Sequence, residues 1–262
     1  TTAALAAGAI DAVEKPALRL SPGGWGATRD ELVCRVRAAA SARVPALGRP
    51  RPAIPAGRPA SRARGGPGDL VVIATSTGGP RALHAVLPRL PSPLGAGVLI
   101  VQHMPVGFTR SLAAHLDAAS ALSVREAAPS DDIRPDTALL APGGSHLEVA
   151  GHGRARLSQA PPVGALRPRA DVTIRSAASH YGARTTLVVL TGMGEDGLDG
   201  ARAVAAAGGT VLVEAESSCV VWGMPRAVQE AGLADAVIPL EAMPIAIVEA
   251  AARGAAAAPP RA

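Results

Sequence analysis

Three short apolar segments, each followed directly by polar residues, limit what this chain can fold into more than any other feature. They are residues 70–75 (LVVIAT), 98–102 (VLIVQ) and 186–190 (TLVVL). Continuous apolar runs of this length, bounded by Gly and Pro, are typical of strands buried on both faces of a parallel α/β sheet. The carboxyl ends of such strands meet at one edge of the sheet, where ligands bind. We therefore expect the residues after these segments to form one site.

Strands and helices alternate after residue 69, which predicts a doubly wound α/β fold with a mainly parallel sheet and helices on both faces. Between 122 and 157 the pattern changes to short strands and turns, and 146–158 indicates an inserted β-hairpin. Two further strands are expected at 210–215 and 235–238. Helices are expected at 80–87, 109–118, 172–180, 198–207, 225–230 and 241–253.

Composition excludes several classes of protein. The net charge of +5 comes with only 2% aromatic residues, a poor pattern for nucleic-acid binding. Cys34 and Cys219 are too few for a disulfide framework or a zinc site. No apolar run approaches the ~20 residues of a membrane helix, and no signal peptide is visible. We expect a cytoplasmic chain that is not inserted in a membrane and binds no metal.

A candidate nucleophile follows the first segment. Ser76 begins the sequence STGGP at a sharp strand-to-helix junction. A serine hydroxyl is a weak nucleophile unless a base accepts its proton. The site is not the G-x-S-x-G elbow of α/β-hydrolases, because Ala74 occupies the position of the leading Gly. The alternative is that Ser76 only caps the following helix.

A candidate base follows the second segment. His103 ends an apolar run and precedes Met104-Pro105, so it shares the strand-end position of Ser76. An imidazole accepts a proton near neutral pH, although a lone histidine is more often structural. The rival bases lie at helical, hairpin or turn positions: His84, His115, His146, His152 and His180.

A candidate acid follows the third segment, in the sequence TGMGEDG. A carboxylate that orients a base must be held at a fixed place by backbone hydrogen bonds. Asp196, next to Gly197 at the opening of a helix, meets that need; the alternative is that it only caps this helix. Glu195 and Asp199 are neighbouring candidates, and we expect Glu195 to be solvated.

Four motifs, in this order, resemble the catalytic domain of CheB, the bacterial chemotaxis protein-glutamate methylesterase. They are STGGP (76–80), VQHMP (101–105), LTGMGEDG (190–197) and SCVVWGMPRA (218–227). The resemblance runs from about Asp69 to about Glu249. It implies that Ser76 is the nucleophile, His103 the base and Asp196 the acid.

The same resemblance implies roles for three residues around the triad. The backbone amide of Met193 would donate to the oxyanion, and Thr77 and Arg167 would lie on the oxyanion or substrate side. In this loop the chain departs from the family pattern, with Leu166 where histidine is common and Arg169 where a small polar residue is common. The alternative for Arg167 and Arg169 is ordinary surface charge.

The first 68 residues differ from the rest. Segment 6–16 (AAGAIDAVEKP) resembles the last strand of a response-regulator receiver domain, and 29–42 predicts a helix with Leu32, Val33 and Val36 on one face. Segment 45–68 is rich in Pro, Gly, Ala and Arg, which is typical of a linker. We interpret 1–44 as a C-terminal receiver remnant, 45–68 as a linker, 69–253 as the methylesterase catalytic domain and 254–262 as a disordered tail. Without the phosphoacceptor segment, we expect activity that no phosphodonor raises.

The implied activity is hydrolysis of glutamate methyl esters on chemoreceptors, and also deamidation of receptor glutamines, with no metal or organic cofactor. The implied partners are methylated chemoreceptor cytoplasmic helices and, through a full-length receiver, the chemotaxis histidine kinase; nucleic acid is not among them, and we expect a monomer. Two alternatives are a regulatory interaction protein with an idle esterase and a hydrolase of small-molecule esters. A phosphate-binding loop is excluded, because Gly78-Gly79 is not followed by Gly-Lys-Ser/Thr.

Overall fold

The structure, a computed structural model, describes residues 68–164 and 166–257, together with positions 9, 10, 29, 32, 33, 36, 37, 39 and 40. Most of the expected receiver remnant, nearly all of the expected linker and residues 258–262 lie outside the described residues. The described positions from 29 to 40 are helical, and Leu32, Val33 and Val36 are exposed there.

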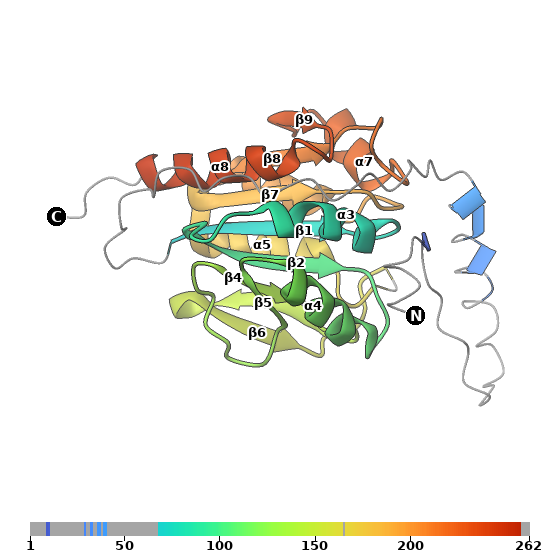
Figure 1. The fold of residues 1–262 in the computed structure, drawn as a ribbon, viewed down its shortest axis with the longest axis horizontal. Coiled ribbons are helices and arrows are strands. Elements are labelled where there is room, and N and C mark those ends of the chain that lie inside the picture. The colour runs from blue at the N-terminus through green and yellow to red at the C-terminus, as the bar shows by residue number, and fades with distance from the viewer. Residues whose placement is uncertain are drawn as a thin grey trace.

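The core of the molecule is one seven-stranded sheet in the order β3-β4-β2-β1-β7-β8-β9 (Figure 1). Every pairing within it is parallel, which confirms the predicted doubly wound sheet. From β1 the chain builds toward one edge and then returns to build toward the other, so the strand order reverses at β1. Its strands are β1 (Asp69–Thr75), β2 (Ala96–Gln102), β3 (Ser123–Glu126), β4 (Thr137–Leu140), β7 (Thr185–Val189), β8 (Thr210–Glu214) and β9 (Ala236–Ile238).

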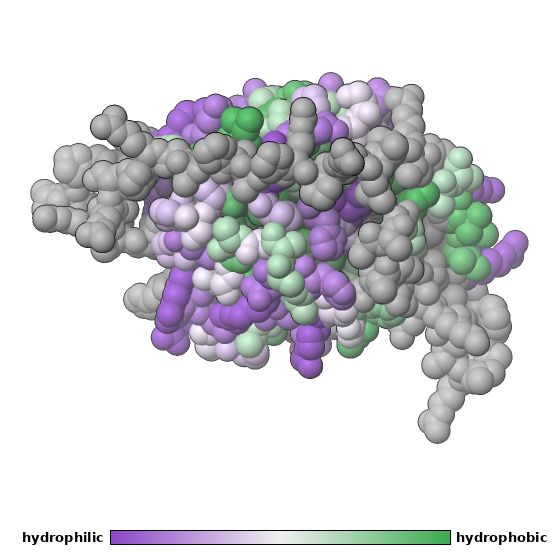
Figure 2. Space-filling view, in the orientation of Figure 1, coloured by the Kyte–Doolittle hydropathy of each residue, from purple (hydrophilic) through white to green (hydrophobic). Residues whose placement is uncertain are grey.

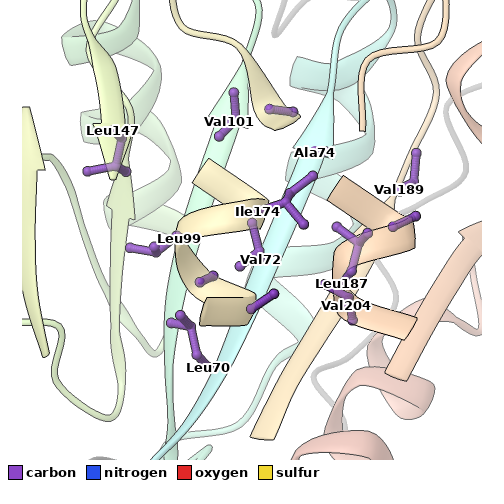
Figure 3. Close-up of a cluster of buried hydrophobic side chains, with 14 of the residues drawn as sticks. Leu70, Val72, Ala74, Leu99, Val101, Leu147, Ile174, Leu187, Val189 and Val204 are labelled. Carbon is purple, nitrogen blue, oxygen red and sulfur yellow. The ribbon is translucent and has the colours of Figure 1, made fainter. Parts of the chain in front are cut away.

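Helices cover both faces of the sheet, because the strands are apolar on both sides. Leu70, Val72 and Ala74 of β1 belong to the core cluster on one face of the sheet (Figure 3), which is covered by α5 (Ala170–Tyr181), α6 (Leu198–Ala206) and α7 (Met224–Glu230). The intervening Val71 and Ile73 face the other core cluster. That cluster is covered by α3 (Gly79–Val86), α4 (Phe108–Ala119) and α8 (Met243–Ala257).

The inserted hairpin is formed by β5 (His146–Ala150) and β6 (Arg154–Ser158), which pair antiparallel with His146 opposite Ser158. This is the hairpin expected from the sequence. Leu147 and Val149 join the core on the α5 side, so the hairpin packs against α5 on that face of the sheet. Three short 3₁₀ turns complete the described elements: η1 (Leu87–Arg89), η2 (Gly151–Gly153) and η3 (Gly182–Arg184).

One helix end differs from the prediction. Helix α8 continues to Ala257, past the expected end at Arg253 and into the segment expected to be a tail. Four alanines follow Gly254, and alanine has the highest helix propensity, whereas one interior glycine costs only about 1 kcal/mol.

The visible surface is mixed in character. Hydrophilic side chains cover much of the face drawn in Figure 2, with apolar ones scattered among them. Among the described residues, no helix is both long enough and apolar enough to cross a bilayer.

Candidate active site

The ends of the three apolar segments lie side by side at the centre of the sheet. β1 is flanked by β2 and β7, with Thr75 opposite Gln102. His103 N–H donates to Thr75 O (3.2 Å), which continues the ladder one residue beyond β2. Ser76 N–H donates to Thr191 O (3.0 Å) on the other side. The backbone of Thr75 and Ser76 is therefore held at the strand end from both sides, Thr75 by His103 and Ser76 by Thr191.

Ser76 is not the cap of the next helix. The N-cap of α3 is Gly78, with a φ of 82°, and that cap has no side-chain hydrogen bond. Ser76 follows Ala74 by two residues, and His103 follows Val101 by two. Ala74 and Val101 both face the α5 side of the sheet (Figure 3). Because side chains alternate along a strand, Ser76 and His103 are the next positions in that same row.

His103 and Asp196 are in direct contact. The distance from His103 Nε2 to Asp196 Oδ2 is 2.6 Å, and their side chains are only 5% and 2% exposed. In the part of the chain that the structure describes, no hydrogen bond joins the Ser76 hydroxyl to His103. The structure thus brings together the expected base and acid, with the expected nucleophile at the neighbouring strand end.

Asp196 is fixed by the start of α5, not by the start of α6 as the capping alternative required. Its carboxylate accepts the N–H groups of Ala170 (2.7 Å) and Asp171 (3.0 Å). Asp171 in turn accepts the N–H groups of Gly197 (2.9 Å) and Gly200 (2.8 Å) at the start of α6. Each aspartate therefore caps the other's helix, which holds the two helix starts together around His103.

This arrangement keeps Asp196 charged. Burial by itself raises the pKa of Asp196, but the hydrogen bond from His103 and the two backbone N–H donors outweigh it and lower the pKa from 3.8 to about 2. For Asp171 the balance is opposite, because burial raises its pKa more than the N–H of Gly200 lowers it. At neutral pH Asp196 is thus a fixed carboxylate, as an acid that orients a base must be.

The two arginines of the substrate-side loop have different surroundings. Arg167 Nη1 donates to the carbonyls of Gln159 and Ala160 (3.2 Å each), so this side chain holds its own loop. Arg169 lies 2.9 Å from Asp171 Oδ2 and 3.3 Å from Asp196 Oδ1, with a side chain only 17% exposed. The surface-charge alternative is wrong for Arg169, which belongs to the carboxylate cluster.

The loop after β7 passes very close to Ser76. A Cβ on Gly192 would lie 2.9 Å from Ser76 Cβ and 3.1 Å from Ser76 N, so only glycine fits. Met224 N–H donates to Gly192 O (2.8 Å) from the opposite side. Met193, next in the chain, is 37% exposed. Thr77 is buried, and its carbonyl accepts the hydroxyl of Thr191 (2.9 Å).

Gly192→Ala tests whether the close approach of Gly192 to Ser76 is needed for catalysis. The added methyl must push Ser76 or Met224 aside, and displacing a reacting group by about 1 Å costs on the order of 10²-fold in rate. We expect kcat for ester hydrolysis to fall by about that factor while the variant stays folded. Gly194→Ala is not a matched control, because Gly194 has a φ of 83°. Gly151→Ala is suitable, since its Cβ meets nothing within 4 Å. Full activity in Gly192→Ala would contradict this account of the loop.

Glu214 is a supporting residue that the sequence interpretation missed. It is fully buried, and its carboxylate accepts the N–H of Thr191 (2.8 Å) and the hydroxyl of Ser218 (3.0 Å). Since the Thr191 carbonyl binds Ser76 N–H, Glu214 fixes the residue that holds the expected nucleophile. The available signal was an acid directly after the apolar run TVLV, where a buried strand ends.

Glu214 predicts a pH-dependent stability difference. Burial raises its pKa above the usual 4.5, more than its hydrogen bonds lower it. A raised folded-state pKa means that the stabilising contribution is complete below the unfolded pKa and is lost as pH rises through the folded value. Glu214→Gln removes this loss, so the free energy of unfolding of the variant relative to wild type should rise between pH 5 and pH 8. Urea unfolding at both pH values measures it; a constant difference would contradict the prediction.

The other histidines do not share the position of His103. His115 and His180 are exposed, whereas His84 is half-buried and burial lowers its pKa. His146 is buried, and its Nδ1 accepts Arg169 N–H (3.3 Å). Glu195 is exposed, as expected. Within the described residues, no group of three or more His, Cys, Asp or Glu residues is arranged to hold a metal ion.

Comparison with known proteins gives a consistent result. The CheB methylesterase family matches residues 71–247. The chain is 46% identical to a protein-glutamate methylesterase/protein-glutamine glutaminase of Symbiobacterium thermophilum, over 97% of this chain and 73% of that protein. It is 43% identical to the protein of the same name from Geobacillus kaustophilus, over 95% of this chain and 72% of that one.

A solved structure agrees. The catalytic domain of the Thermotoga maritima CheB methylesterase superposes with a TM-score of 0.68 at 44% identity, covering 70% of this chain and 98% of that domain. The family match includes the ends of β1, β2 and β7 and both helices capped by the aspartate pair. This chain belongs to the CheB methylesterase family.

Proposed function

We propose that this chain hydrolyses methyl esters of glutamate side chains on chemoreceptors, and that it deamidates receptor glutamines at the same site. The observation that carries the proposal is the buried contact between His103 and Asp196, one strand away from Ser76. A base oriented by a fixed carboxylate beside a serine is the arrangement that serine ester hydrolysis requires. The names of the relatives support the choice of substrate.

In the first half of the reaction, Ser76 Oγ attacks the ester carbonyl carbon while His103 accepts the hydroxyl proton. Since Nε2 is bound to Asp196, we assign Nδ1 as the nitrogen that takes this proton. The imidazolium then gives the proton to the leaving oxygen, and methanol departs from an acyl-enzyme on Ser76. Water, deprotonated by His103, attacks this ester and restores glutamate and the free serine. With a glutamine substrate the leaving group is ammonia, and the remaining steps are the same.

The oxyanion is assigned to backbone donors. Gly192 brings the chain within contact of Ser76, so the N–H of the adjacent Met193 is a reasonable donor to the negatively charged oxygen. We place Thr77 on the same side. Arg167 is proposed as a residue of the substrate-side loop, acting through the carbonyls it holds.

The proposal includes the setting of the reaction. We propose that the chain acts as a monomer in the cytoplasm, on the cytoplasmic helices of methylated receptors. We propose that a chemotaxis histidine kinase controls this site only through a full-length receiver domain, and that without a phosphoacceptor segment no phosphodonor raises the activity. The match to the Symbiobacterium thermophilum protein covers 97% of this chain and so extends beyond the catalytic segment, which supports that link.

The test is release of radiolabelled methanol from receptor-containing membranes methylated beforehand. Wild type should release methanol, and His103→Ala should release it several orders of magnitude more slowly. A parallel assay for ammonia release from receptor glutamines tests the second activity. Absence of methanol release by the wild type would contradict the proposal.

A further inference from the structure

The guanidinium of Arg169 lies against both aspartates of the site. Arg169 precedes α5, and its guanidinium contacts both carboxylates: Asp171 Oδ2 through Nη2 (2.9 Å) and Nε (3.2 Å), and Asp196 Oδ1 through Nε (3.3 Å). The side chains of Asp171 and Asp196 are each 2% exposed, so these contacts lie where water screens them little.

Two further hydrogen bonds fix Arg169. Its Nη1 donates to Val163 O (3.3 Å), and its backbone N–H donates to His146 Nδ1 (3.3 Å). The guanidinium is therefore fixed between the loop before α5 and the carboxylates rather than free to sample solvent. Arg169 is one of the two positions, with Leu166, at which this loop departs from the expected sequence pattern.

The cation has a consequence for the base. Asp196 attracts the protonated form of His103 and so favours a ring that is unable to accept a proton. Arg169, beside the other oxygen of the same carboxylate, offsets that attraction. The charged and titratable groups around this contact are Asp196 from the β7–α6 loop, Asp171 from α5, Arg169 from the loop before α5, His146 from β5, and Asp199 from α6, whose charge also acts on Arg169.

We propose that Arg169 is a positioning residue for the hydrolysis: it holds Asp196 against His103 and keeps the imidazole neutral, and so competent as a base, to lower pH than the His103–Asp196 pair alone allows. This inference rests on the proposed function, because it assumes that His103 is the base. The raised pKa of Arg169, in which the carboxylates outweigh burial, is consistent with a cation that stays charged throughout.

The test is the pH profile of kcat/KM for methanol release in three variants. Arg169→Met removes charge and hydrogen bonds at similar length, Arg169→Gln keeps a donor without charge, and Arg169→Lys keeps the charge. We expect the acidic limb to move to higher pH by about 0.5–1 unit in the Met and Gln variants, and Lys to restore most of the wild-type profile. Arg156→Met, which breaks an exposed pair with Glu148 on the hairpin, is the matched control and should leave the profile unchanged.

The outcomes distinguish a failure of the proposed function from a failure of the role proposed for Arg169. If His103→Ala retains full activity, the proposed function fails and Arg169 has no base to act on. If His103→Ala is inactive but the folded Met and Gln variants keep the wild-type acidic limb, the present inference is wrong and the proposed function stands. A lower kcat at every pH with no shift of the limb also overturns it, since a purely structural role gives that result. Melting temperatures show which variants are folded, and the Gln variant serves if the Met variant is not.

Discussion

Ser76→Ala is expected to lower kcat/KM for methyl ester hydrolysis by about 10⁴-fold or more, because it removes the only atom that forms the acyl intermediate. Stability should change little. The side chain is half-buried, and the contacts that hold this residue are made by its backbone, with Ser76 N–H on Thr191 O and Ser76 O accepting from Gln102 Nε2 (2.9 Å). Initial rates of methanol release, with melting temperatures alongside, measure both effects.

Ser123→Ala is the control for this experiment. Ser123 is an exposed residue of β3, far along the sheet order from β1, and its variant should behave as wild type. A Ser76→Ala enzyme with more than about a tenth of wild-type activity would show that another group attacks the ester.

Asp196→Asn should have two separable effects. It should lower kcat by about 10²–10⁴-fold, less than Ser76→Ala, because the carboxylate orients and stabilises the base without attacking the substrate. It should also destabilise the fold, since the pKa near 2 against an unfolded value near 3.8 corresponds to about 2 kcal/mol of stability at neutral pH. A depressed folded-state pKa gives stability that is complete above the unfolded pKa and is lost as pH falls toward 2. The stability difference from wild type should therefore narrow below about pH 4.

Rates at pH 7 and urea unfolding at several acidic pH values measure the two effects. Asp199→Asn is the matched control, because Asp199 is exposed and lies three residues from Asp196. Among the side-chain ion pairs of the described residues, its only partner is the exposed Arg202. Equal rates for wild type and Asp196→Asn would contradict the role assigned to the acid. A stability difference independent of pH would contradict the electrostatic account of Asp196.

The sheet and the place of the site were predictable because the signals are local. Each of the three central strands is a short apolar run with a breaker after it, and parallel strands end at one edge wherever they fall in the sheet order. Ser76 and His103 directly follow two paired strands, so the local pattern and the strand register are enough to predict that they lie side by side.

The contacts around Asp196 were not predictable in the same way, because they depend on how α5 packs beside α6. From sequence, an aspartate before a helix is expected to cap that helix. Here Asp196 and Asp171, 25 residues apart (196 − 171), each cap the other's helix. The surface-charge alternative for Arg169 could not be decided from the sequence for the same reason: only the meeting of the two helix starts places carboxylates beside it.

Glu214 shows a related limit of prediction from the sequence. A carboxylate after an apolar strand indicates a strand end, and nothing in the adjacent residues tells that it will be buried. Its partners, Thr191 and Ser218, come from the neighbouring strand end and from its own loop. Burial of this group is decided by loop packing that no local pattern encodes.

The central claim is that Ser76 is activated by the His103–Asp196 pair, and covalent labelling with a serine-directed fluorophosphonate tests it most directly. Cleavage after arginine gives the peptide 65–81, in which Ser76 is the only serine, and fragmentation of this peptide by tandem mass spectrometry distinguishes an adduct on Ser76 from one on Thr75 or Thr77. We expect wild type to gain one adduct on this peptide, and His103→Ala to label on the order of 10³-fold more slowly. An adduct on another residue, or equal labelling rates at Ser76 in wild type and His103→Ala, would contradict the account.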